Sequence, residues 1–358
     1  MPKRALVLAG GGARGSYQVG MLDYLVNDCG LDFDVLRGVS VGALNTAFLA
    51  QAQRGAGPPA SLANLRQQVA ALKSLWTNEI TGDHSVYGER AGGLAGLAVG
   101  ADSLYTTDPL WHLIQKHVDV QALQTSGRDF RVGTVSLVSG HYVEWQPSDT
   151  HFLRRVLASA SIPVVFPFVP FDDDRDVLVD GGVRNITPLS SAFRAEPDEV
   201  YVLLTSRLIR DHDDELPDSA VETNTYEQWD DNWLGTKVGG FDVLKRTVDI
   251  LTDEIYLDDL RGALRWNAVA QGVEAVHDAV AQFGAPQEVR DAVDAVVATM
   301  KGAAKRRVGL YVLAPREWFG DDNSSTDFSP KLIAGAIQHG RDVAADRSLW
   351  AWPPAVAP

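Results

Sequence analysis

The sequence predicts an α/β fold with a mostly parallel central sheet. Short apolar runs that suit buried strands alternate with longer segments of helical spacing, and glycine-rich turns separate them. Apolar residues make up 45% of the 358 residues and charged residues 22%, which is the composition of an ordinary globular protein. Strands that alternate with helices favour a parallel sheet that is covered on both faces.

The chain opens with two units of strand, turn and helix. Residues 5–9 are apolar and predict a buried strand, and residues 16–26 have the mixed apolar spacing of a helix. Residues 33–39 then predict a second strand, and residues 43–53 predict a helix rich in small residues. Two consecutive units of this kind favour parallel pairing of their strands.

The remaining predicted elements extend the sheet and add a helical segment. Residues 130–138 and 141–145 predict a hairpin, because Ser139-Gly140 suits a two-residue turn. Further helices are predicted at residues 61–76, from Asp108-Pro109 onward, and at residues 151–160, 241–300 and 330–343, with strands at residues 177–179, 200–204 and 308–313.

These elements predict three regions along the chain. We expect a core over residues 1–206, a helical insertion or lid region over residues 207–305, and a strand and helix over residues 306–358 that return to the core. The insertion is expected because residues 210–227 are acidic and polar, and the apolar stripe of the next segment is helical.

Charge and cysteine content exclude some classes of function. The net charge of -15 repels polyanions, so we expect no nucleic-acid partner. The single cysteine, Cys29, cannot form an intramolecular disulfide and fits a reducing compartment. The apolar run at residues 5–9 is too short for a secretory signal, and no stretch is long enough to span a membrane. We therefore expect a cytoplasmic protein.

One short motif places a serine where it can act as a nucleophile. Gly38-Val39-Ser40-Val41-Gly42 has glycines two before and two after the serine, which leave room for a strained turn. An apolar strand leads into the motif and a helix leads out of it, which is the setting that a nucleophile elbow requires. The alternative interpretation is an ordinary tight turn.

A glycine loop follows the first strand and opens the first helix. Its residues are Gly10, Gly11, Gly12, Ala13, Arg14 and Gly15. Amides at the start of a helix suit an oxyanion or a phosphate. Three of the glycines also fit the Gly-x-Gly-x-x-Gly pattern of dinucleotide-binding folds. That interpretation lacks the acidic residue wanted at the end of the second strand, where Val39-Ser40 stands.

A carboxylate ends a later strand. Asp180-Gly181-Gly182 follows the apolar residues 177–179, which places an acid at the edge of a core, beside two glycines that permit close approach of another backbone. Desolvation raises the pKa of such a carboxylate, so that it can accept a proton from a nearby serine. The alternative interpretation is a hairpin turn.

Histidine is the more usual base, and three histidines follow Asp180 in the order of a Ser-Asp-His triad. His212 lies in an acidic loop, His277 on a charged helix, and His339 at the end of a helix. None of them has a sequence context that favours catalysis. The His and Cys residues also lack the spacing of a metal site, so we expect no metal and no cofactor.

The glycine loop, the elbow at Ser40 and Asp180-Gly181-Gly182, in this order, resemble the patatin-like phospholipase family. The resemblance covers residues 5–206, whereas residues 210–300 match nothing in the core of the family. The further matching stretches are residues 158–163, Phe166-Pro167, residues 185–188 and, more loosely, residues 335–340.

The resemblance implies a three-layer α/β/α fold and hydrolysis of lipid acyl esters by a Ser-Asp dyad without a metal. It implies that Ser40 attacks the ester carbonyl and that Asp180 is the general base. The amides of Gly11, Gly12 and Ala13 would form the oxyanion hole, and Arg14 would stabilise that loop. The expected partner is a lipid or acyl-ester substrate, met with transient membrane contact.

Other functions are compatible with the same residues. Acyl transfer to an alcohol and hydrolysis of short-chain esters would use the same dyad, since they share the acyl-enzyme. A phosphate- or nucleotide-binding module would use the glycine loop, and a non-catalytic scaffold would use the helical insertion for binding a partner.

Overall fold

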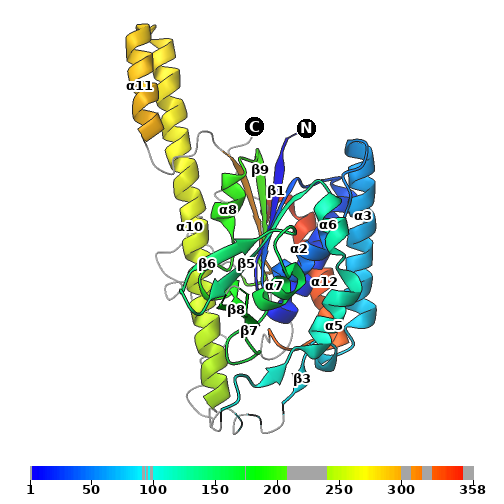
Figure 1. Ribbon diagram of the computed structural model, residues 1–358. Helices are drawn as coiled ribbons and strands as arrows, with labels where there is room; N and C mark the ends of the chain where they lie inside the picture. Colours follow the sequence, from blue (N-terminus) through cyan, green and yellow to red (C-terminus); the bar gives the residue numbers. More distant parts are fainter. Residues whose placement is uncertain are drawn as a thin grey trace.

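The computed structural model describes residues 2–90, 93, 96, 100–173, 175–207, 240–299, 308–316 and 325–349. These residues form one large sheet with helices on both faces (Figure 1). The strands of this sheet are β1 (Arg4–Leu8), β2 (Val35–Val39), β5 (Asp129–Ser136), β6 (Tyr142–Trp145), β7 (Val169–Phe171), β8 (Asp176–Asp180), β9 (Glu199–Leu203) and β10 (Gly309–Leu313). The short strands β3 (Gly88–Glu89) and β4 (Tyr105–Thr106) pair separately.

The helices cover the sheet and extend beyond it. They are α1 (Gly15–Asp23), α2 (Val41–Leu49), α3 (Pro58–Ser74), α5 (Asp108–His117), α6 (Val120–Thr125), α7 (Phe152–Ser159), α8 (Leu189–Arg194), α10 (Gly240–Gln282), α11 (Gln287–Thr299) and α12 (Pro330–Ala345). Single turns of 3-10 helix lie at Gly12–Arg14, Asp83–Ser85, Gly181–Val183 and Arg347–Leu349, and single turns of π-helix lie at Tyr24–Asp28 and Leu75–Glu79.

The sheet is mostly parallel, as the sequence predicts. Its strand order is β10-β9-β1-β2-β5-β8-β7, with β6 also paired to β5. Strands β10, β9, β1, β2 and β5 run parallel, whereas β6 and β8 run antiparallel to β5. The parallel strands carry their carboxyl ends to one edge of the sheet, and both the glycine loop and Ser40 follow such ends.

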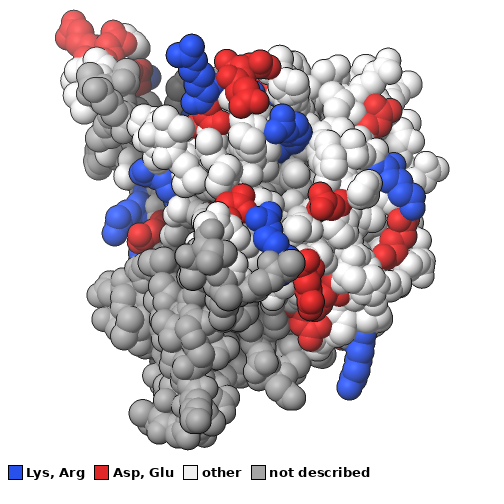
Figure 2. Space-filling model, turned by 60° about the horizontal axis from the view of Figure 1, so that its bottom comes forward, with Lys and Arg blue, Asp and Glu red and all other residues white. Residues whose placement is uncertain are grey.

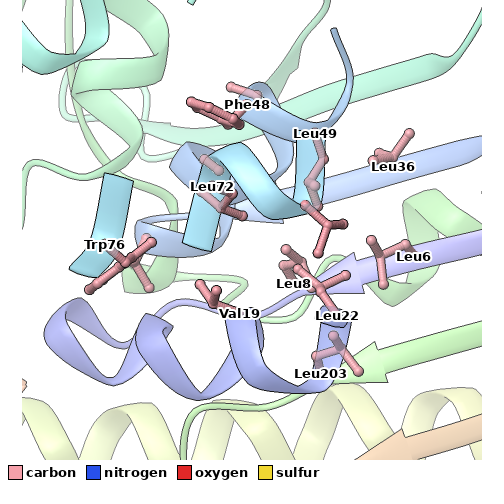
Figure 3. Packing of buried hydrophobic residues seen from close by; sticks show 14 of the residues in the cluster. Leu6, Leu8, Val19, Leu22, Leu36, Phe48, Leu49, Leu72, Trp76 and Leu203 are labelled. Carbon is pink, nitrogen blue, oxygen red and sulfur yellow. The ribbon is translucent and has the colours of Figure 1, made fainter. Parts of the chain in front are cut away.

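Two apolar layers sandwich the sheet, so the chain has the three-layer α/β/α architecture. On β1, Leu6 and Leu8 face the layer that contains α1, α2, α3 and α12, while Ala5 and Val7 face α8 and α10. Figure 3 shows Leu6 and Leu8 among the leucines of the first layer. Strands buried on both faces need continuous apolar sequence, which is why these runs lack the alternation of a half-exposed strand.

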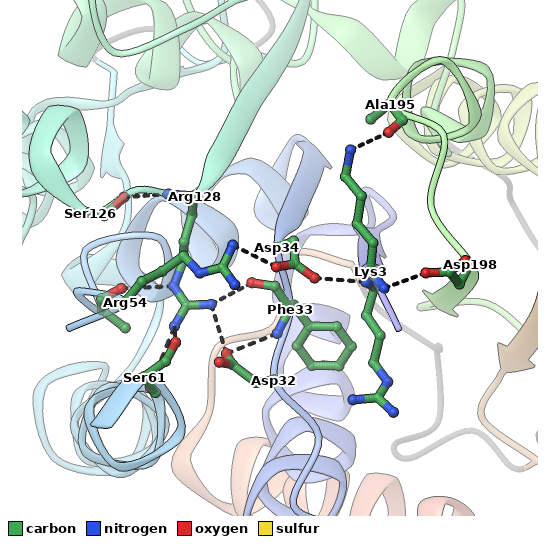
Figure 4. Close-up of polar contacts among 12 residues, drawn as sticks. Lys3, Asp32, Phe33, Asp34, Arg54, Ser61, Ser126, Arg128, Ala195 and Asp198 are labelled. Carbon is green, nitrogen blue, oxygen red and sulfur yellow. Dashed lines mark hydrogen bonds and ion pairs between the residues drawn. The ribbon is translucent and has the colours of Figure 1, made fainter. Parts of the chain in front are cut away.

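A polar network holds the other end of the parallel strands. The guanidinium of Arg128 is buried and pairs with Asp32 at 2.8 Å, and it also donates to the Ser61 hydroxyl at 3.1 Å (Figure 4). Asp34 pairs with Arg54 at 2.6 Å. This network lies before the starts of β2 and β5, so it ties the loops there together at the end of the sheet away from Ser40.

Helix α10 packs on the sheet along part of its length. Tyr256, Leu260 and Ala263 are buried in the layer that also contains α8. Beyond that contact, α10 and α11 extend away from the sheet as a helical hairpin (Figure 1), where Phe283 is 85% exposed. Residues 208–239 and 300–307 of the predicted insertion lie outside the described residues. Among the described residues, no helix combines the length and hydrophobicity of a membrane span.

Candidate active site

The register of β5 explains how Ser40 and Asp180 meet. Val39, the last residue of β2, lies opposite Gly133 of β5. Asp180, the last residue of β8, lies opposite Thr134, the next residue of β5. Strand β5 therefore changes partner between these two positions, so the residue that follows β2 is brought beside the residue that ends β8.

Ser40 occupies a strained backbone position. Its φ of 57° and ψ of -131° lie in a region that residues other than glycine rarely adopt. Helix α2 begins at Val41, two residues earlier than the sequence predicts, because Ser40 itself makes the turn. The flanking glycines permit the turn: a Cβ on Gly38 would clash with the Gly42 carbonyl, and one on Gly42 would clash with the Leu8 carbonyl.

The segment at the end of α7 holds both residues of the pair. The amide of Ser40 donates to the hydroxyl of Ser159 at 3.1 Å, and that hydroxyl donates to the carbonyl of Gly133 at 2.6 Å. Two residues further on, the carbonyl of Ser161 accepts from the amide of Asp180 at 3.0 Å. One short segment thus fixes the backbone at both Ser40 and Asp180.

Asp180 is almost entirely buried, and burial raises its pKa to about 7 against hydrogen bonds from Ser40 and Gly182 that lower it. The Gly182 amide donates to Oδ1 at 2.7 Å. Oδ2 is buried and has no hydrogen bond of good geometry, although Ser40 is close enough to lower the pKa as a donor. The two side chains are therefore adjacent without an ideally aligned hydrogen bond.

The glycine loop packs directly against Ser40. A Cβ on Gly10 would lie 3.0 Å from the Cβ of Ser40. Gly11 and Gly12 have φ of 146° and 57°, values that favour glycine. Arg14 is buried, and its guanidinium donates to the Gly11 carbonyl and to the Ser206 hydroxyl, both at 3.4 Å. Its side chain therefore connects the glycine loop to the segment after β9.

One amide of the loop is already engaged. The amide of Ala13 donates to the carbonyl of Ser325 at 2.7 Å, and a Cβ on Gly12 would clash with the same carbonyl oxygen. The next residue after Ser325 is also fixed, because the Tyr87 hydroxyl donates to the carbonyl of Thr326 at 2.8 Å. In the described part of the chain, the amides of Gly11 and Gly12 donate to no backbone carbonyl.

An apolar cavity opens at Ser40. Its walls come from α2, from the end of α3, from α5 and from the segment around Phe328. None of the described residues of α10 or α11 is among them. The lining residues are Gly12, Ser40, Val41, Leu44, Asn45, Phe48, Leu72, Leu75, Trp76, Ile80, Val86, Leu110, Leu113, Ile114, His117, Val118, Ala160, Ile162, Phe166, Ser325, Thr326 and Phe328.

The histidines weighed as bases are not placed beside Ser40. His277 lies on α10 and pairs with Asp294 at 3.5 Å. His339 accepts from the amide of Arg316 at 3.0 Å and packs against Tyr17. His212 lies outside the described residues. The described residues contain no cluster of His, Cys, Asp and Glu side chains that could bind a metal ion.

Several residues at the site have no signal in the sequence. His117 lines the cavity and bonds to Glu79 at 2.9 Å, far from any motif. The carbonyl of Ser325 contacts the glycine loop through the backbone, which no side-chain pattern reveals. Ser159 stands in a stretch that the family resemblance includes, but its bond to Ser40 depends on the fold.

The fold and the site define an α/β/α protein with a strained serine at a strand-to-helix turn and a buried carboxylate beside it. The family model described as patatin-like phospholipase matches residues 6–193, which is more than half of the chain. The chain therefore belongs to the patatin-like phospholipase family, a family of lipid acyl hydrolases, as the motifs predict.

The solved structures that are similar to this chain include the crystal structure of VipD from Legionella pneumophila, with 12% sequence identity and a TM-score of 0.37. The likeness covers 96% of this chain and 66% of that chain, so this chain spans just under two thirds of the length of VipD in that structure. No curated protein matches the chain.

Proposed function

We propose that this protein hydrolyses acyl esters of lipids, with Ser40 as the nucleophile and Asp180 as its general base. The observation that carries the proposal is the pairing of a strained serine with a buried carboxyl group whose pKa is raised to about 7. A carboxylate with that pKa accepts a proton near neutral pH and returns it within the same cycle.

The proposed reaction has two stages. In the first, Ser40 Oγ bonds to the ester carbonyl carbon while Asp180 takes the hydroxyl proton, and the alcohol leaves with that proton as the ester bond breaks. In the second, Asp180 takes a proton from water, the hydroxide oxygen bonds to the acyl carbon, and the Ser40 ester bond breaks. Ser40 regains the proton and the fatty acid is released.

The glycine loop is the proposed oxyanion site. It lies against Ser40, and its amides stand at the start of a helical turn, where the partial positive charge favours an oxyanion. We assign the role first to Gly11 and Gly12. The amide of Ala13 can join them only when it exchanges the Ser325 carbonyl for the substrate oxygen.

The lining of the cavity supports an apolar acyl group as the substrate part bound there. The wall formed by α2 runs from Ser40 to Phe48, which corresponds to ~12 Å along a helix. Phe48 and His117 face each other near the far end, with ring centroids 6.1 Å apart. Among the described residues on the face shown in Figure 2, acidic and basic side chains are interspersed.

The test is hydrolysis and covalent labelling by the wild type and by Ser40→Ala. We expect the wild type to release fatty acid from mixed phospholipid vesicles and, with a fluorophosphonate probe, to gain the mass of the phosphonyl group on Ser40 as fluoride leaves. Ser40→Ala should do neither, whereas Ser190→Ala, an exposed serine on α8, should match the wild type. Full hydrolysis by Ser40→Ala would contradict the proposal.

The activity should depend on pH through Asp180. Because the base must be ionised and its pKa is about 7, kcat/KM for a fatty-acyl nitrophenyl ester should rise about tenfold per pH unit below that value and level off above it. The measurement is kcat/KM from pH 5 to pH 9, corrected for spontaneous hydrolysis. A flat profile over this range, or a midpoint near the ordinary carboxyl pKa, would contradict the raised pKa of Asp180 on which the proposal rests.

A further inference from the structure

Two buried hydroxyls meet the glycine loop from the side opposite to the cavity. The hydroxyl of Tyr256 on α10 donates to the carbonyl oxygen of Gly10 at 2.6 Å, and the hydroxyl of Thr205, just after β9, donates to the same oxygen. The two hydroxyl oxygens are 2.7 Å apart. Thr205 is fully buried and Tyr256 is 3% exposed, so water does not compete for these bonds.

The count of hydrogens shows that the carbonyl of Gly10 is firmly held. Three oxygens lie in mutual contact, and the two hydroxyls supply one hydrogen each. The carbonyl oxygen only accepts, so it takes a hydrogen from both hydroxyls, or from one hydroxyl that in turn accepts from the other. The amide of Gly10 is also fixed, because it donates to the carbonyl of Ile186 at 3.2 Å.

Holding this carbonyl also sets the direction of the next amide. In a planar trans peptide the C=O of Gly10 and the N–H of Gly11 point in opposite directions. Tyr256 packs in the apolar layer that α8 and α10 form on one face of the sheet. The cavity at Ser40 and Gly12 lies on the opposite face, in the layer that contains α2 and α3. A carbonyl turned toward Tyr256 therefore turns the Gly11 amide toward the side of the cavity.

We propose that Thr205 and Tyr256 are positioning residues for the oxyanion site. Their hydroxyls hold the Gly10–Gly11 peptide so that the Gly11 amide faces the carbonyl attacked by Ser40, and they polarise this peptide so that the amide donates more strongly. The inference rests on the proposed function. Both residues lie outside residues 6–193, so the segments that follow the family match complete the site.

The test compares steady-state kinetics of Tyr256→Phe, Thr205→Val and the double variant on a fatty-acyl nitrophenyl ester. Each single variant leaves one hydroxyl on Gly10 and should lower kcat by about fivefold, the worth of one hydrogen bond. The double variant should lose about a hundredfold, as when one oxyanion donor is removed. KM should stay unchanged, since the amide acts on the transition state.

Two controls separate positioning from general damage. Thr205→Ser keeps the hydroxyl and should retain most of the kcat that Thr205→Val loses. Tyr311→Phe removes a tyrosine hydroxyl from β10, where the ring stacks on Tyr201, and should leave kcat unchanged.

A ligand pair reads out the oxyanion directly. A trifluoromethyl ketone with a fatty-acyl chain forms a hemiketal oxyanion on Ser40, so its affinity should fall in each variant by the same factor as kcat/KM. The corresponding secondary alcohol forms no oxyanion and should bind all variants equally. This comparison uses ratios within one protein, so it holds even where a variant is less stable.

The outcomes distinguish the inference from the function on which it rests. Turnover by the wild type that depends on Ser40, together with unchanged kcat in the double variant, would overturn the positioning role alone. Equal losses of ketone and alcohol affinity would also overturn it. A wild type that neither turns over esters nor labels at Ser40 would overturn the proposed function and this inference together.

Discussion

Asp180→Asn should lower kcat/KM by about 10⁴-fold and at the same time make the protein more stable. The activity falls because an amide cannot take the proton of Ser40. Stability rises because the folded protein no longer buries a carboxyl group that ionises at neutral pH. The isosteric amide can keep the bond from the Gly182 amide, which now goes to Oδ1 at 2.7 Å.

The sign of the stability change follows from the two pKa values. The pKa of Asp180 is raised from an ordinary 3.8 to about 7, so the folded state holds its proton more tightly than the unfolded state. The carboxyl group therefore destabilises the fold increasingly from pH 4 to pH 7, and fully above that range. Asp180→Asn should raise the free energy of unfolding by roughly 2 to 4 kcal/mol at pH 8 and by little at pH 4.

Urea unfolding at about pH 4 and about pH 8 measures the change in the free energy of unfolding, with kcat/KM determined on the same samples. The matched control is Asp176→Asn at the other end of β8, whose carboxylate accepts from the Ser136 hydroxyl at 2.7 Å. That variant should keep its activity. An Asp180→Asn protein that is less stable than the wild type at pH 8 would show that ionised Asp180 stabilises the fold.

The second large effect is expected at the elbow. Gly42→Ala should destabilise the protein by about 3 kcal/mol or more, because its Cβ would clash with the backbone carbonyl of Leu8 in β1. The strand cannot move aside without breaking its pairing with β2 and β9. The helix that begins after Ser40 would shift instead, and the activity should fall with it.

Thermal and urea unfolding of Gly42→Ala and Gly272→Ala form the matched comparison. Gly272 is an exposed position of α10 with no atom near the position of a Cβ. Alanine there should stabilise the helix by about 0.5 to 1 kcal/mol. Similar stability changes for the two substitutions would contradict the close packing of the elbow against β1.

The sequence predicts the parts of this molecule that depend on local pattern. Apolar runs and glycine turns predict the parallel strands, and spacing around Ser40 predicts the strand-to-helix turn, since both follow from neighbouring residues. The change of partner along β5 depends on the whole sheet, so the sequence suggests Asp180 as a partner but not how it reaches Ser40. The contact of Tyr256 with Gly10 joins residues far apart in the chain, and no local pattern contains it.

The Ser325 carbonyl accepts a hydrogen bond from the Ala13 amide, so it competes with a substrate oxygen for that amide. A tethered competitor acts at a local concentration that dilution of the protein does not reduce. A substrate oxygen that uses the Ala13 amide therefore binds with an apparent affinity lowered by the fraction of molecules in which this amide is free. For such a substrate, the occupancy of the site depends on whether the Ala13 amide bonds to the Ser325 carbonyl or to the substrate oxygen.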